Sequence, residues 1–66
     1  MTLKTITVEF NVEYGRSFRP FHGWVYYMVS GDDYKFYEIL PDKKDHRLLA
    51  TIPRERVKNI EEKILL

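Results

Sequence analysis

The clearest regularity in the chain is a strict alternation of apolar and polar residues over positions 5–14. The apolar positions are Ile6, Val8, Phe10, Val12 and Tyr14, and the polar ones are Thr5, Thr7, Glu9, Asn11 and Glu13. A period of two is typical of a β-strand with one face on the core and the other in water. The pattern therefore predicts a strand over 5–14 that ends at Gly15.

The most apolar stretch, residues 23–40 (GWVYYMVSGDDYKFYEIL), predicts a β-hairpin. Apolar residues are continuous rather than alternating over 24–29, so both faces of this strand need cover. That favours a central strand of a closed barrel over an edge strand. Gly31 can take a positive φ and two aspartates follow it, which predicts a tight turn between strands over 23–30 and 34–40.

Two less regular segments flank the hairpin. Residues 16–22 (RSFRPFH) are expected to form a loop or an irregular edge segment, because Pro20 has no backbone donor and favours extended geometry at Arg19. Residues 41–46 are polar and begin with Pro41, which indicates an exposed connection. A short strand is expected after it, over 47–52.

The end of the chain allows two interpretations. In ATIPRERVKNIEE, the residues Ile52, Pro53 and Val57 resemble the closing element of SH3-like barrels, where a strand ending in Ile-Pro leads through one 3₁₀ turn to a last strand opening with Val. The resemblance implies an all-β fold, a small five-stranded SH3-like or Sm-like barrel with its last strand over 57–61. A bulge between Val57 and Ile60 lets both face the core. The alternative is an α+β fold, with a four-stranded antiparallel sheet and a C-terminal helix over 54–66.

Composition narrows the class of protein. The 66 residues are expected to form one domain over 1–66, whose core depends on ten aromatic residues. The chain has no cysteine, which excludes disulfides and thiolate metal sites and is compatible with the cytoplasm. Residues 1–10 lack the apolar block of a secretory signal, and the apolar run over 24–29 is far shorter than the roughly 20 residues of a membrane span.

Catalytic and metal-binding signatures are weak. The sequence contains no phosphate-binding glycine loop, no GxSxG and no HExxH motif. Ser17 and His22 share one segment, but nothing in the pattern completes a catalytic triad. Asp42, Asp45 and His46 are the one compact group of metal-ligand types, with two lysines between them that repel a cation. We therefore expect a protein that is not an enzyme and has no cofactor or metal.

The most informative chemistry is an alternation of basic and aromatic residues over 16–24. The candidate ligand-binding residues are Arg16, Phe18, Arg19, Phe21, His22 and Trp24, with Tyr26, Lys35, Arg54 and Arg56 as an extension. Cations that neutralise phosphates and flat rings that stack on bases are typical of single-stranded nucleic-acid binding, which is the function we expect from this pattern. The alternative is a purely structural role, in which the aromatic rings close the barrel and the arginines are solvated.

A formal net charge of +1 provides no general attraction to nucleic acid. The second functional hypothesis is therefore a protein-interaction or self-assembling module, a homo-oligomer included, that uses the same surface. Arginine, tryptophan and tyrosine are enriched at the centres of protein interfaces.

Overall fold

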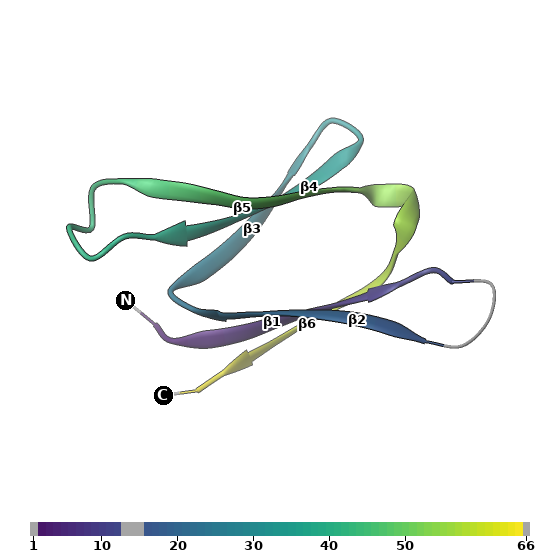
Figure 1. The fold of residues 1–66 in the computed structure, drawn as a ribbon, viewed down its shortest axis with the longest axis horizontal. Coiled ribbons are helices and arrows are strands. Elements are labelled where there is room, and N and C mark those ends of the chain that lie inside the picture. The colour runs from purple at the N-terminus through teal and green to yellow at the C-terminus, as the bar shows by residue number, and fades with distance from the viewer. Residues whose placement is uncertain (1, 13–15, 66) are drawn as a thin grey trace.

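The computed structural model describes residues 2–12 and 16–65, which form strands and one short 3₁₀ turn (Figure 1). The elements are β1 (Lys4–Phe10), β2 (Ser17–Gly23), β3 (Val25–Ser30), β4 (Asp33–Ile39), β5 (His46–Pro53), η1 (Arg54–Arg56) and β6 (Val57–Ile64). They build two three-stranded antiparallel sheets, ordered β2-β1-β6 and β3-β4-β5. The all-β class is confirmed. Among the described residues no hydrogen-bonded ladder joins the two sheets, so closure into a barrel stays a prediction.

A bend at Gly23 and Trp24 connects the sheets. β2 is the outer strand of the first sheet, and the chain passes directly from it into β3, an outer strand of the second (Figure 1). Gly23 has a φ of 111°, and the Trp24 carbonyl oxygen accepts a hydrogen bond of 2.8 Å from the Ile39 N–H. One continuous segment, 17–30, therefore supplies an edge strand to each sheet.

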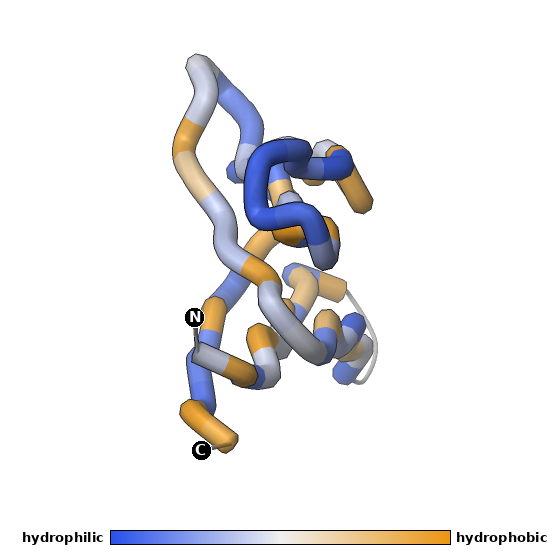
Figure 2. Tube along the Cα trace, turned by 90° about the vertical axis from the view of Figure 1, so that its left-hand side faces the viewer, coloured by the Kyte–Doolittle hydropathy of each residue, from blue (hydrophilic) through white to orange (hydrophobic). Residues whose placement is uncertain are grey.

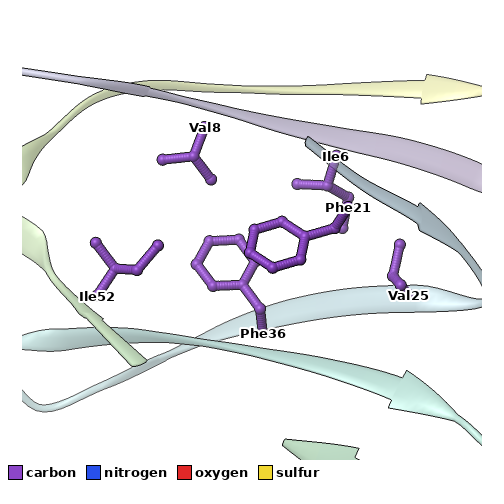
Figure 3. Packing of buried hydrophobic residues seen from close by; sticks show 6 residues of the cluster. All are labelled: Ile6, Val8, Phe21, Val25, Phe36 and Ile52. Atoms are coloured by element: carbon purple, nitrogen blue, oxygen red, sulfur yellow. The ribbon is translucent and has the colours of Figure 1, made fainter. Parts of the chain in front are cut away.

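The core lies between the two sheets (Figure 3). Its buried apolar residues are Ile6, Val8, Phe21, Val25, Phe36 and Ile52. The rings of Phe21 and Phe36 stack across the two sheets, with centroids 4.7 Å apart and an interplanar angle of 10°. Because each strand of the second sheet and two of the first contribute a buried side chain, this cluster ties five strands together.

The first strand is shorter than its alternation predicts. It ends at Phe10, and Asn11 turns to the 3₁₀ turn instead, donating its backbone N–H to the Arg56 carbonyl at 2.8 Å. The prediction of a strand through Asn11 and Val12 is wrong, and Glu13 to Gly15 lie outside the described residues. The polar face of β1 is also not fully exposed to solvent, because Glu9 is buried, with 8% exposure.

The segment predicted to be a loop is a regular strand. β2 pairs with β1 along its whole length, from Lys4 opposite Gly23 to Phe10 opposite Ser17. The prediction of a loop over 16–22 is therefore wrong, while its alternative, an edge segment, is right in position. With β2 included, the described residues form six strands and not the expected five. An edge strand tolerates Pro20, because the backbone groups on the open side of such a strand form no hydrogen bonds to a neighbouring strand, and the missing N–H of proline is not needed there.

The central hairpin is confirmed, but the place of its first strand is not. Ser30 pairs with Asp33, which leaves Gly31 and Asp32 as a two-residue turn with Gly31 at a φ of 60°. β3 is an edge strand of its sheet, and Met28 and Val29 are both about half exposed. The prediction of a central strand covered on both faces is thus wrong for this half of the hairpin.

The end of the chain follows the strand interpretation. The 3₁₀ turn begins after Pro53, whose φ is −57°, and β6 follows it. Phe10 pairs with Val57 while Glu9 pairs with Asn59, so Lys58 is the extra residue of a bulge. The bulge brings both Val57 and Ile60 against the core, as expected. The alternative helix over 54–66 is wrong for the described part of that range, and the strand extends to Ile64.

The polar connection before β5 is confirmed as exposed and is held by a local turn. Asp42 Oδ1 accepts hydrogen bonds from the backbone N–H groups of Asp45 and Lys44, at 3.0 and 2.9 Å. These two bonds, that from Asp45 first, lower the pKa of the Asp42 carboxyl from its ordinary value. Asp42 therefore acts as a turn residue here.

Candidate ligand-binding surface

Alternation along β2 and β3 sorts the predicted site residues onto two faces. Phe21 and Val25 are buried between the sheets, so odd-numbered positions of this segment face the core. Even-numbered positions face outward, with Phe18 and His22 exposed and Trp24 half-buried at the bend. Beyond the bend, Tyr26 pairs with Tyr37 on the outward face of the second sheet. Because the core lies between the two sheets (Figure 3), this face points away from the face that carries Phe18 and His22.

This arrangement produces an aromatic row along the outside of the bent segment. The aromatic row consists of Phe18, His22, Trp24 and Tyr26. Successive outward positions within one strand are about 6.6 Å apart, but the chain bends at Gly23 and Trp24, so Phe18 and His22 lie on the outer face of the first sheet and Tyr26 on the outer face of the second. Pro20 takes the outward position between Phe18 and His22. A ligand that contacts the whole aromatic row must therefore follow the chain around the bend.

The Tyr26 end of the aromatic row is held by neighbours on the second sheet. The Tyr26 and Tyr37 rings stack with centroids 5.2 Å apart and an interplanar angle of 16°. The Tyr26 hydroxyl is hydrogen-bonded to His46 Nδ1, and the two rings also meet edge to face. The orientation of Tyr26 is therefore fixed before any ligand binds. At the bend, His22 Nδ1 is hydrogen-bonded to Thr5 Oγ1 at 2.9 Å, which orients the His22 ring in the same way.

The Phe18 end is exposed and lies beside a cation. Phe18 is 51% exposed, and the Arg16 guanidinium lies 5.3 Å from the centroid of its ring. Arg16 Nε also donates to Glu9 Oε2 at 3.1 Å, and Lys58 Nζ lies 3.9 Å from the same oxygen. Glu9 thus offsets part of the positive charge at this end. The long side chains of Arg16 and Lys58 explain why its carboxylate is shielded from water.

Two predicted site residues do not join the aromatic row. The Phe21 ring is in the core and has no free face for a ligand. Arg19 occupies an odd position and places its guanidinium 5.0 Å from the Phe21 centroid, at the open edge of β2. The six side chains expected to act as one cluster are therefore divided by the sheet.

The predicted extension residues lie in two places. Lys35 pairs with Met28 and Thr51 on the outward face of the second sheet, the face that also carries Tyr26 and Tyr37. Arg54 and Arg56 belong to η1, which lies on the opposite side of the molecule from the bend (Figure 1). Arg54 packs its guanidinium 5.9 Å from the centroid of Tyr34. Lys35 can therefore extend the aromatic row, and the two arginines form a separate basic corner.

The weak catalytic pair is separated by the strand. Ser17 and His22 are five residues apart in β2, about 17 Å along an extended chain, and they face opposite sides. They are too far apart for a hydrogen bond between nucleophile and base. In the part of the chain that the structure describes, no group of three or more histidine or carboxylate side chains is placed to hold a metal ion.

Sequence reasoning missed the partners of Tyr26. Neither Tyr37 nor His46 was expected to contact Tyr26, yet they fix the orientation of one end of the aromatic row. The contact with Tyr37 could have been predicted from the two-residue turn at Gly31 and Asp32, because this turn sets the register in which Tyr26 lies opposite Tyr37. His46 could not be found in this way, because a long connection separates it from β4.

None of the helical structure in residues 2–12 and 16–65 is long and apolar enough to cross a membrane. Comparison with known proteins gives no match to this chain among protein-family models, curated protein sequences or solved structures.

Proposed function

We propose that the protein is a non-catalytic binding module that holds single-stranded nucleic acid along the aromatic row. The observation that carries the proposal is the outward alignment of Phe18, His22, Trp24 and Tyr26 on one continuous bent segment. Flat rings that follow one another along the bent segment suit the bases of a flexible single strand that bends with it, since every base offers a face for stacking. Arg16 and Lys35, towards the two ends of this surface, supply cations for the phosphates.

We further propose that the two sheets are the halves of an SH3-like barrel. Support comes from the long bent segment shared by both sheets, the 3₁₀ turn after Pro53 and the last strand that opens with Val57. In this arrangement the aromatic row runs along the outside of the barrel, where a ligand meets it without displacing the core. A cytoplasmic location, compatible with the absence of cysteine, belongs to the same proposal.

The first expected result concerns stacking. Phe18→Ala should weaken the binding of a single-stranded oligonucleotide by about 1–3 kcal/mol, the usual worth of one stacked base, with little change in stability because Phe18 is 51% exposed. Fluorescence titration measures this directly, since Trp24 is the one tryptophan of the chain. Ile64→Ala is the matched control, because Ile64 is exposed and apolar and faces the opposite side of the first sheet from Phe18 and His22.

The second expected result concerns charge. Lys35→Gln should reduce the slope of log affinity against log salt by about 0.7, the value for one phosphate contact on a single strand. Lys44→Gln, in the exposed connection before β5, should leave that slope unchanged. Failure of the unmodified protein to bind at low salt would refute the proposed function.

A further inference from the structure

Within residues 2–12 and 16–65 the outer edge of β3 has no strand partner, and its sequence differs from those of the other outer strands. Its sequence, VYYMVS, contains no charged residue and no proline. β2 and β5 each contain an arginine and a proline, and β6 contains two lysines and two glutamates. Charges and proline are the usual means by which proteins block unwanted strand pairing at a sheet edge. β3 lacks both.

The open part of this edge is also apolar on both sides. Met28 faces outward and is 49% exposed, while Val29 faces the inner side and is 54% exposed. The other side of the β3–β4 hairpin is held by β5 and η1, since Asp33 pairs with Pro53 and the Asp32 carbonyl accepts a hydrogen bond of 2.8 Å from the Arg54 N–H. The hairpin projects from the body of the chain, and its β3 side is turned away from these contacts (Figure 2). Two neighbouring apolar side chains on opposite faces cannot both be covered by a ligand lying on one face of the sheet.

The backbone of β3 offers hydrogen-bonding groups at the same place. The bond from the Ile39 N–H to the Trp24 carbonyl marks these two residues as a hydrogen-bonded pair. In an antiparallel ladder such pairs alternate, so Tyr26 and Met28 direct their backbone groups to β4. Tyr27 and Val29 therefore direct theirs to the open side. Near the bend that side is less accessible, because β1 begins alongside, with Lys4 opposite Gly23.

We propose that β3 pairs in antiparallel fashion with β3 of a second copy of this chain, about a two-fold axis at Met28. This register places Tyr27 of each copy opposite Val29 of the other, and their free N–H and C=O groups make four hydrogen bonds. An aromatic ring beside a β-branched side chain is a favourable cross-strand pair. The two Met28 side chains meet on the outward face, so both exposed apolar residues are covered and no charges oppose each other.

A second copy fits this edge because the segment is complementary to itself in that register. The contact involves only positions 26–30 of each chain, less than an ordinary stable interface, so the dimer forms reversibly and depends on concentration. Self-association was one of the two functions expected from the sequence, but this edge is not the surface expected for it. The dimer does not rest on the proposed nucleic-acid binding, and all its tests are made without nucleic acid.

Cross-linking tests the register. The natural chain has no cysteine, so Met28→Cys introduces one thiol that can form a disulfide only between copies. Opposed residues of a non-hydrogen-bonded pair have Cα atoms about 4.5 Å apart, within the range of about 4.4–6.8 Å that disulfides accept. Mild oxidation should convert M28C to a covalent dimer much faster than S30C, which lies opposite Tyr26, or T51C, which is exposed on β5.

Charge tests the contact independently of the disulfide. Sedimentation equilibrium should show the mass rising towards a dimer with concentration, and Met28→Lys should weaken association about tenfold or more, because two ammonium groups then meet on the axis. Thr51→Lys adds the same charge to the same face and should leave the dimer intact. A monomer up to millimolar concentration would overturn the inference, as would faster cross-linking of S30C or T51C than of M28C.

Discussion

Replacing Phe36 by alanine is expected to remove a large part of the free energy of unfolding of the protein. Phe36 is 1% exposed, and its ring contacts both Phe21, at 4.7 Å between centroids, and Tyr27, at 5.6 Å. Removing a buried phenylalanine ring costs about 3–5 kcal/mol. A domain of 66 residues has a total free energy of unfolding of about 3–10 kcal/mol, so this one change removes much of it.

Urea denaturation followed by circular dichroism measures the effect. Phe36→Leu keeps most of the volume and is expected to lose about 1 kcal/mol, which gives a measurable transition if F36A does not fold. Phe18→Ala is the matched control, because it deletes the same ring from a side chain that is 51% exposed and should change stability by less than about 0.5 kcal/mol. Similar losses for F36A and F18A would contradict a core between the two sheets.

The fold was predictable where one segment carries its own pattern. The alternation from Thr5 identified β1, and Gly31 with the aspartates identified a turn whose register follows from its length. Pro53 and Val57 identified the 3₁₀ turn and the opening of β6. These features depend on neighbours in sequence, so local propensity and pattern suffice to find them.

β2 could not be predicted, because its own pattern is poor and its stability comes from elsewhere. Arg19 and Pro20 interrupt any strand signal, yet pairing with β1 and burial of Phe21 hold the segment extended. Because of this error, all six candidate residues were expected to lie together in one site. In a loop, six neighbouring side chains can form one cluster, whereas in a strand alternate residues face opposite sides. Phe21 was therefore assigned to a ligand although it belongs to the core.

The prediction for β3 failed for a different reason. Its strong apolar pattern correctly predicted a strand, but the strand lies at the edge of its sheet and not at the centre. A continuous apolar run indicates that both faces need cover, but it does not identify what covers them. In the single chain, Val25 and Tyr27 pack on the core while Met28 and Val29 remain exposed. Pairing with a second copy would supply the missing cover, so the run of apolar residues and the edge position are consistent with each other.

The bend between the sheets leads to the second large expected effect, a loss of stability in Gly23→Ala that exceeds the loss in Gly31→Ala. Both glycines have positive φ, 111° at Gly23 and 60° at Gly31, and a Cβ at either would meet no atom within 4 Å. The cost of each substitution is therefore backbone strain alone. The left-handed region near 60° costs an alanine about 1 kcal/mol, whereas the conformation at Gly23 lies outside that region and should cost about 2–3 kcal/mol.

Urea midpoints of the two alanine variants, with Gly31→Asn as a substitution that the left-handed region tolerates well, provide the comparison. Equal losses for the two alanines would mean that the bend relaxes without strain. Gly23 also lies between His22 and Trp24, so a G23A protein that relieves the strain by changing φ also changes the angle between these two rings of the aromatic row. It should then bind an oligonucleotide less tightly than the natural protein, while G31A, at the remote tip of the hairpin, should bind equally well. If G23A is stable and binds the oligonucleotide as tightly as the natural protein, the bend does not determine how the aromatic row binds. The proposed function would then lose its geometric basis.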